Sequence, residues 1–285
     1  MRTLLRLALE EDLGSGDVTT LATVPAHTPT RAVLRFRDPG VTAGLAIFEP
    51  LAAAFRARRR PEEEADMLAL VECAGDAQRV AAGAAVCSLS GSARALLTVE
   101  RTFLNFVARL SGVATLTHAY VEAVRAVGAK TRILDTRKTT PGWRALEKYA
   151  VACGGGENHR MGLFDAVLVK DNHVEAAGGI ATAVRRAIAA APQGMPIEVE
   201  CDTAEQIDEA LAAGATALLL DNFTPEQVEA AVAKVAGRAR IEVSGGVTLE
   251  TVADYASAGA DDISVGRLTH SAPALDVTLE LEIYE

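Results

Sequence analysis

The sequence predicts an α/β fold in which a mainly antiparallel α/β sandwich precedes a parallel, barrel-like β/α domain. The first observation is a change of rhythm, from short alternating segments before residue 95 to repeated strand and helix segments after residue 130. The second is composition: 49% of the 285 residues are hydrophobic and only 4% are aromatic. Such a chain is typical of buried parallel strands covered by helices rich in alanine.

Alternating segments and turn residues define the N-terminal part. Residues 32–37 alternate and lead into a turn at residues 38–40, and further strands are expected at 68–72 and 85–89. Residues 43–58 are expected to form a helix against this sheet, and residues 58–64 a solvated loop. Alternation between tight turns predicts an antiparallel sheet.

A long helical stretch links the two parts. Residues 95–127 carry an apolar stripe at helical spacing, and we expect a break near Ser111 and Gly112.

Short apolar strands then recur with helical segments between them, which indicates a parallel sheet and, at this number, a barrel. The expected strands are residues 132–135, 166–170, 196–200, 217–221, 240–244 and 262–266.

Each of these strands ends in a polar residue or glycine. In a β/α barrel the carboxyl ends converge on one mouth, where barrel enzymes keep their active sites. In chain order, the ends are Asp135, Lys170, Glu200, Asp221, Ser244 and Gly266.

Cations are concentrated in loops that follow the first two of these strands, although the chain has a formal net charge of -10. A dense cationic pocket on an acidic protein favours a small substrate with several carboxylates or phosphates, and disfavours a nucleic acid. A glycine triplet, residues 154–156, would let backbone amides approach such an anion. The cations are Arg137, Lys138, His159, Arg160, Lys170 and His173.

Several residues allow more than one interpretation. Lys170 could form a Schiff base, bind an anion, or pair with Asp171 or Asp221. Glu200 and Asp221 could bind Mg²⁺, accept hydrogen bonds from ribose, or stabilise a developing cation.

Two glycine-containing turns follow the last two strands, where barrel enzymes commonly bind phosphate through backbone N–H groups. They comprise Ser244, Gly245 and Gly246, and Val265, Gly266 and Arg267. Arg101, by its spacing alone, resembles a helix-surface residue paired with a neighbour.

Other classes of protein are disfavoured. No apolar run is long enough to span a membrane, and acidic residues occur too early for a secretory signal. The four cysteines have no metal-ligand spacing and are expected to be reduced thiols in a cytoplasmic protein.

Taken together, these motifs resemble the quinolinate phosphoribosyltransferase family. The most specific block joins residues 135–142, the Gly-Gly-Gly-x-Asn-His-Arg loop at 154–160, and residues 170–173. Further matching segments are residues 9–20, 100–105, 109–115, 148–150, 198–200, 220–223, 244–246 and 268–271.

The resemblance implies an α/β sandwich at residues 1–110, completed by a returning tail at 275–285, and an open, barrel-like domain at 111–274. Residues 277–283 alternate as a returning strand should. It also implies a homodimer in which Arg101 enters the partner's site, and it leaves assembly into hexamers open.

The implied reaction joins quinolinate to phosphoribosyl pyrophosphate (PRPP) and gives nicotinate mononucleotide, pyrophosphate and CO2 in NAD biosynthesis. Mg²⁺ is the implied cofactor, with Glu200 and Asp221 as candidate ligands. Lys138, Lys170, Glu200 and Asp221 are the implied catalytic residues. The implied substrate-binding set adds Arg101, Thr136, Arg137, His159, Arg160 and the two phosphate turns.

Two residues depart from the family pattern. Trp143 replaces an aliphatic residue, and Glu157 adds a negative charge to the loop at residues 154–160 (the anion loop), where we expect it to point outward. Four alternatives remain at this stage: a Schiff-base lyase that uses Lys170, a binding protein without turnover, a transferase that prefers nicotinate, and a related branch associated with molybdate transport.

Overall fold

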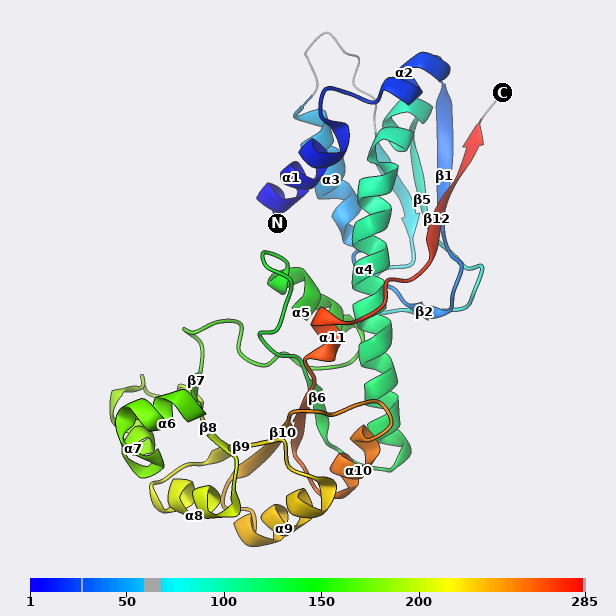
Figure 1. Ribbon diagram of the computed structural model, residues 1–285. Coiled ribbons are helices and arrows are strands. Elements are labelled where there is room, and N and C mark those ends of the chain that lie inside the picture. The colour runs from blue at the N-terminus through cyan, green and yellow to red at the C-terminus, as the bar shows by residue number, and fades with distance from the viewer. Residues whose placement is uncertain (27, 59–67, 284–285) are drawn as a thin grey trace. The chain divides into compact units, whose positions relative to one another are not determined.

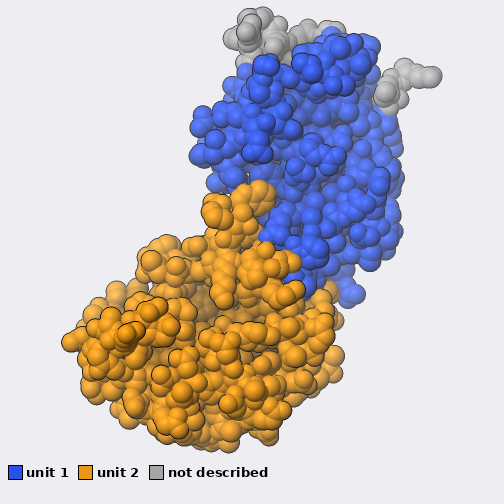
Figure 2. All heavy atoms as spheres, in the orientation of Figure 1, with its two compact units in different colours: residues 1–116, 272–285 blue, residues 117–271 orange. Residues whose placement is uncertain are grey.

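The computed structural model describes residues 1–26, 28–58 and 68–283, so His27 and almost all of the loop predicted at 58–64 lie outside the described residues. The chain divides into two compact units, which Figure 2 distinguishes by colour. Unit 1 comprises Met1–Leu116 and Ala272–Glu285, and unit 2 comprises Thr117–Ser271. The predicted domain boundaries at 110/111 and 274/275 fall a few residues from these limits.

Unit 1 contains a four-stranded antiparallel sheet in the order β12-β1-β5-β3. Its strands are β1 (Pro29–Phe36), β3 (Ala69–Cys73), β5 (Ala85–Ser92) and β12 (Val277–Ile283), and two short strands, β2 (Gly40–Val41) and β4 (Arg79–Val80), pair separately. The strand predicted at 277–283 is β12, which pairs antiparallel with β1 from Thr30 to Phe36 (Figure 1).

Helices α1 (Arg2–Leu13), α2 (Val18–Thr23) and α3 (Phe48–Arg56) accompany this sheet, and a 3-10 turn at Leu45–Ile47 precedes α3. The helix predicted at 43–58 therefore begins later, because Gly44 adopts a left-handed conformation before the turn. Within the core, Phe48 of α3 packs edge-on against Phe103 with 5.2 Å between ring centroids.

The long helix α4 (Ala93–Ala126) is continuous, so the break predicted near Ser111 and Gly112 is wrong. Both residues serve tertiary contacts within unit 1 instead. The Ser111 hydroxyl bonds the backbone of Ala43, and a Cβ at position 112 would lie 1.9 Å from the carbonyl oxygen of Pro273. The glycine is required by this close approach of two backbones.

Unit 2 is a parallel β/α sheet of six strands in the order β6-β11-β10-β9-β8-β7 (Figure 1). The strands are β6 (Arg132–Leu134), β7 (Val167–Val169), β8 (Ile197–Cys201), β9 (Ala217–Asp221), β10 (Arg240–Ser244) and β11 (Asp262–Ser264). The helices are α5 (Arg144–Cys153), α6 (Asp171–Ala177), α7 (Ile180–Ala190), α8 (Ala204–Ala212), α9 (Pro225–Val235), α10 (Val252–Ser257) and α11 (Arg267–His270). All six strands lie at the segments predicted for them.

The first and last strands of unit 2 in chain order, β6 and β11, are neighbours, as in a barrel, and β6 and β7 form the two ends of the sheet. Beside β6 the chain adds a single parallel bridge between Leu134 and Glu157. The barrel is therefore open between the loop at residue 157 and β7 among the residues that the structure describes. Across these same residues, no helix is long and apolar enough to cross a membrane.

Local sequence signals explain where several helices begin. The hydroxyls of Thr203 and Thr224 each accept a hydrogen bond from the backbone N–H of a glutamine three residues later, and the side-chain oxygen of that glutamine accepts from the threonine backbone N–H. These capping boxes fix the starts of α8 and α9 directly after β8 and β9. The strand ends, which carry the candidate site, are thereby held in place.

Candidate active site

Polar side chains occupy the inner face of the barrel at two-residue intervals. Because side chains alternate along a strand, Glu198 and Glu200 share one face of β8, as Arg240 and Glu242 do on β10. Contacts between strands arrange these residues in three tiers from the amino to the carboxyl ends of the strands.

The amino-end tier consists of Arg132, Arg240 and Asp262. Arg132 donates to both carboxylate oxygens of Asp262, at 2.6 and 2.9 Å, and Arg240 also donates to both. Burial alone would raise the pKa of Asp262, but the hydrogen bonds from the two arginines outweigh it and hold this pKa below its ordinary value. This tier ties β6, β10 and β11 together and is structural.

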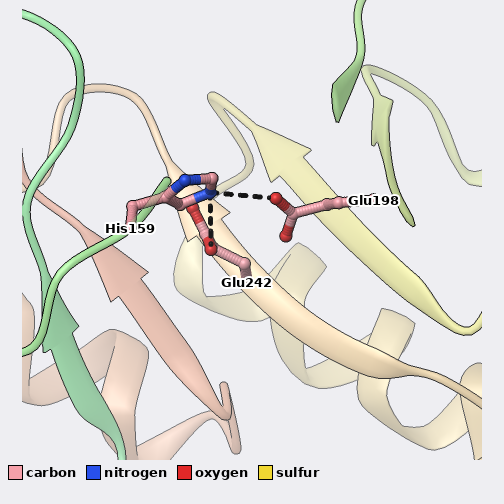
Figure 3. Close-up of side chains that lie close together, drawn as sticks. All are labelled: His159, Glu198 and Glu242. Carbon is pink, nitrogen blue, oxygen red and sulfur yellow. Dashed lines mark hydrogen bonds and ion pairs between the residues drawn. The ribbon is translucent and has the colours of Figure 1, made fainter. Parts of the chain in front are cut away.

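The middle tier consists of His159, Glu198, Glu242 and Ser264, and Figure 3 shows the first three. His159 Nε2 lies 3.0 Å from Glu198 Oε2 and 3.5 Å from Glu242 Oε2. Ser264 donates its hydroxyl to the other oxygen of Glu242. Burial, together with the neighbouring Glu198 carboxylate, raises the pKa of Glu242 to about 8.

A buried ion pair holds the segment that brings His159 into the barrel. Lys148 of α5 and Asp135, directly after β6, pair with each other, and neither side chain is exposed. Asp135 accepts from the backbone N–H of His159 at 3.0 Å, and Lys148 donates to the carbonyl of the same residue at 2.8 Å. The side-chain NH2 of Asn158, turned toward Asp135, also donates to its carboxylate, at 2.6 Å. Burial raises the pKa of Asp135, and the hydrogen bond from Lys148 opposes only part of that rise.

The carboxyl-end tier contains Lys170, Glu200, Asp202 and Asp221. Lys170 Nζ lies 2.5 Å from Glu200 Oε2. One carboxylate oxygen from each of the three acidic residues lies within 4.8 Å of the others. Burial raises the pKa of Asp221, and Lys170 opposes this rise. Clustered carboxylate oxygens are the ligands that Mg²⁺ prefers, so this donor set fits that ion.

The two predicted phosphate turns lie at the same end of the barrel. Gly245 and Gly246 both have positive φ, at 89° and 65°, and a Cβ at Gly245 would collide with Asn222. A Cβ at Gly266 would lie 3.1 Å from the Lys138 side chain. Thr269 of α11 donates to the Lys138 carbonyl at 2.7 Å, so α11 anchors the loop that carries this lysine.

Arg137, Arg160 and Lys170 line a groove of about 450 Å³ beside β7. Burial lowers the pKa of Arg160, and the neighbouring Arg137 guanidinium lowers it further. Leu163 and Phe164 lie in the same groove with 76% and 74% of their surface exposed. The groove thus combines crowded cations with uncovered apolar side chains.

Comparison with known proteins places this geometry in a family. Residues 17–111 match the N-terminal domain of quinolinate phosphoribosyl transferase, and residues 113–280 match its C-terminal domain. The chain belongs to the quinolinate phosphoribosyl transferase family.

Related proteins cover nearly the whole chain. The nicotinate-nucleotide pyrophosphorylase [carboxylating] of Mycobacterium leprae is 46% identical, over 98% of this chain and 96% of its own length. The crystal structure of NadC from Streptococcus pyogenes has a TM-score of 0.89 and 40% identity, over 99% of this chain and 96% of that one. The structure of the nicotinate-nucleotide pyrophosphorylase from Francisella tularensis has a TM-score of 0.89 and 38% identity, over 99% and 95%. These matches confirm the family and fold that the motifs predicted.

The quinolinate phosphoribosyl transferase fold brings most predicted site residues to one end of the barrel in unit 2. Arg137 and Arg160 line the groove with Lys170, Lys170 pairs with Glu200, and Lys138 approaches Gly266. Thr136 accepts from the backbone N–H of Lys138 at 3.0 Å. Arg101 belongs to unit 1, where it is an exposed residue of α4.

Two further residues of the family motifs have structural partners. His173 accepts from the backbone N–H of Lys170 through Nδ1 at 2.9 Å, which caps the start of α6. Glu157 pairs with Arg132 at 2.8 Å, and that arginine begins β6, at the opposite end of the strand from the loop with Lys138.

The structure adds residues that sequence reasoning missed. Glu198, Glu242 and Ser264 lie inside strands that we interpreted only as apolar runs. One signal could have found them: Glu198 precedes Glu200 by two residues, and Glu242 precedes Ser244 by two, so each pair must share a strand face. Asp202 follows Glu200 by the same two residues. Lys148 lies in one of the segments that match the family, residues 148–150, but no spacing pointed to its partner Asp135.

Proposed function

We propose that this chain transfers the phosphoribosyl group of PRPP to quinolinate, with loss of CO2, and forms nicotinate mononucleotide and pyrophosphate. The observation that carries the proposal is the adjacency of crowded cations and clustered carboxylates at the carboxyl ends of one barrel. Lys170 joins the two sets, since it lines the groove of Arg137 and Arg160 and pairs with Glu200.

Quinolinate carries two adjacent carboxylates, and Arg137, Arg160 and Lys170 supply the matching positive charge. Arginine offers a planar pair of donors to a carboxylate, whereas lysine offers a compact charge. Nicotinate has only one carboxylate and would leave part of this charge unpaired, so quinolinate is the better match.

The carboxyl-end tier supports the PRPP site. Glu200, Asp202 and Asp221 would hold Mg²⁺, which when bound shields the charge of the departing pyrophosphate. The backbone N–H groups at Gly245–Gly246 and at Gly266 would receive the 5-phosphate, with Lys138 beside them.

In the transfer step the quinolinate ring nitrogen forms a bond to the sugar carbon while the bond from that carbon to pyrophosphate breaks. Positive charge develops on the sugar as the pyrophosphate leaves. Glu200 and Asp221, as carboxylates, stabilise this charge electrostatically. The cations in the groove hold the ring so that its nitrogen faces the sugar.

Decarboxylation follows from the chemistry of the ring. Once alkylated, the nitrogen is positively charged and stabilises the electron pair that remains on the adjacent carbon when CO2 departs. A proton then replaces the lost carboxylate on that carbon. Lys138 and Lys170 are the two candidate residues to assist this step.

The direct test incubates the purified protein with PRPP, Mg²⁺ and either quinolinate or nicotinate, and follows nicotinate mononucleotide by chromatography. We expect product from quinolinate and none above background from nicotinate. Product from nicotinate alone, or from neither acid, would contradict the proposal. Borohydride trapping of Lys170 with a carbonyl substrate would instead support the lyase alternative.

We also propose a homodimer in which Arg101 completes the partner's site. The uncovered Leu163 and Phe164 support an interface in unit 2, as does the edge of β7 that pairs with no strand among the described residues. An Arg101→Ala variant and a Lys138→Ala variant, each strongly impaired alone, should recover activity when mixed and refolded, because one of the two sites in a mixed dimer would be intact. No recovery in mixed dimers would contradict a shared site.

A cytoplasmic location is part of the same proposal. The four cysteines are free thiols, as is usual in a reducing compartment. Fractionation of the native host, with detection of the protein by antibody, tests it.

A further inference from the structure

The middle tier places two glutamates where the proposed reaction assigns them no role. The side chains of Glu198 and Glu242 are only 14% and 4% exposed, and both approach the same nitrogen of His159 (Figure 3). A buried carboxylate is costly unless its hydrogen bonds are satisfied, and here the satisfied partners are Ser264 and the imidazole.

Both nitrogens of His159 are engaged within the chain. The backbone N–H of Arg160 donates to Nδ1 at 2.7 Å, so Nδ1 presents a lone pair and carries no proton. The ring proton is therefore on Nε2, which donates to Glu198. Burial disfavours a charged ring, yet the carboxylates of Glu198 and Glu242 outweigh it and raise the pKa of His159. The hydrogen bond at Nδ1 keeps the ring neutral, because a proton on Nδ1 would face the N–H of Arg160.

The orientation of this ring determines the direction of the chain that follows it. His159 Nδ1 holds the backbone of Arg160, and the Arg160 side chain donates to the Ala166 carbonyl at 3.3 Å on its way into the groove. On the other side of the ring, Asp135 and Lys148 fix the His159 backbone. The Arg160 guanidinium is thus connected to β8 and β10 through a single imidazole.

We propose that Glu198 and Glu242 are positioning residues that orient a neutral His159, and through it place Arg160 to bind a carboxylate of quinolinate. This role rests on the proposed function. The two glutamates should therefore affect the binding of quinolinate in the groove and leave the binding of PRPP unchanged, since neither belongs to the carboxyl-end tier.

The positioning role requires a hydrogen-bond acceptor at each glutamate and does not require negative charge. Substitutions that keep an acceptor should therefore differ in effect from substitutions that remove it. A glutamine at either position keeps an oxygen that can accept from Nε2, whereas a leucine of similar size keeps none. We expect Glu198→Leu and Glu242→Leu to raise KM for quinolinate about tenfold or more, with KM for PRPP unchanged within about twofold. Glu198→Gln and Glu242→Gln should stay within about threefold of the wild-type KM for quinolinate.

The matched control is Asp262→Asn, which neutralises another buried carboxylate of the same barrel, in the amino-end tier. It should lower thermal stability while leaving KM for quinolinate unchanged, because Asp262 contacts only Arg132 and Arg240 among the contacts described above. Unfolding midpoints measured for all variants separate a loss of fold from a loss of positioning.

A second measurement does not depend on turnover. Long-range ¹H–¹⁵N correlation spectra of protein labelled at histidine distinguish the two neutral tautomers and the charged ring. We expect His159 to be the neutral Nε2–H form in the wild type and in Glu198→Gln.

The outcomes are distinct. Leucine variants with a wild-type KM for quinolinate, glutamine variants as impaired as leucine variants, or a charged His159 would each overturn the proposal. If the leucine variants do not fold, the glutamine variants and the spectra still decide. If the wild-type protein makes no nicotinate mononucleotide, the proposed function fails, whereas the tautomer result stands by itself.

Discussion

Lys148 and Asp135 form an ion pair in which neither side chain is exposed to solvent. Two charges removed from water are tolerated only when their remaining donors and acceptors are satisfied, and here the backbone of His159 satisfies both. A helix, a strand end and the anion loop are therefore joined at one buried point below the site.

Removal of one partner should expose the cost of this arrangement. Lys148→Met leaves the Asp135 carboxylate buried without its cation, and we expect a loss of about 3–5 kcal/mol in the free energy of unfolding. Urea denaturation followed by circular dichroism measures it. The double variant Lys148→Met, Asp135→Leu should recover part of the loss; if it is less stable than the single variant, the ion pair is not the cause.

Substitution of Lys138 should reduce catalysis without changing the stability of the fold. Its side chain is exposed and lies beside Gly266, so Lys138→Ala should leave the melting temperature unchanged and reduce kcat by about 10²–10³-fold. Lys130→Ala, which removes another exposed lysine of unit 2, is the control and should retain full activity. Activity retained by Lys138→Ala would exclude the lysine from the transfer step.

The acidic part of the carboxyl-end tier predicts how activity depends on metal. Chelation should abolish turnover and Mg²⁺ should restore it. Asp221→Asn should raise the Mg²⁺ concentration for half-maximal activity by about tenfold or more, because it weakens one of three oxygen donors. Titration of activity with Mg²⁺ measures this, and Glu175→Gln, at an exposed site on α6, should titrate as the wild type does.

Glu242 makes stability depend on pH in a defined direction. Its pKa is 4.5 in an unfolded chain and about 8 in the folded protein, so between these values only the folded state holds the proton. Stability from this group therefore falls as pH rises from about 4.5 to 8. Glu242→Gln removes the penalty and should be more stable than the wild type at pH 7, by a few kcal/mol at most.

The same pair of proteins at pH 5 provides the check. At pH 5 the glutamate is protonated in the folded protein, and the pH lies close to its pKa of 4.5 in the unfolded chain, so little of the penalty has developed and the difference in unfolding free energy should shrink. A difference between Glu242→Gln and wild type that is constant from pH 5 to pH 8 would show that Glu242 does not titrate as described.

Gly112 links α4 to the segment that leads into β12. Gly112→Ala would drive a Cβ against the Pro273 carbonyl, and because that atom belongs to the backbone it cannot rotate away. We expect a destabilisation of about 1–3 kcal/mol. Hydrogen exchange should increase along residues 277–283, and unchanged exchange there would contradict the proposed clash.

The sequence predicted the positions of strands better than the tertiary contacts between segments. Strands β10 and β12 coincide with the predicted residues, because an apolar or alternating run between turns is a local signal. The prediction of a break at Gly112 was wrong, because a glycine inside a helix can mark either a helix break or a close approach of another backbone. Only the position of Pro273 distinguishes the two.

The site divides in the same way. Glu200 and Asp221 were found because they end strands, and parallel strand ends must converge. The middle tier was not found, because the role of Glu198 depends on its contact with His159. That histidine lies 39 residues earlier in the chain, in a loop. The path of that loop depends on Asp135 and Lys148, which no spacing rule connects to it.

The position of β12 has a consequence for how the chain is made. Strands β1 and β5 leave the ribosome early, but β12, which pairs with β1 along Val277–Ile283, emerges only after all of unit 2 has been synthesised. Until then β1 presents an unpaired edge to the cell, and such edges recruit other strands. Unit 1 therefore completes its sheet only after unit 2 has been synthesised, and a nascent chain that pauses within unit 2 leaves this edge of β1 unpaired.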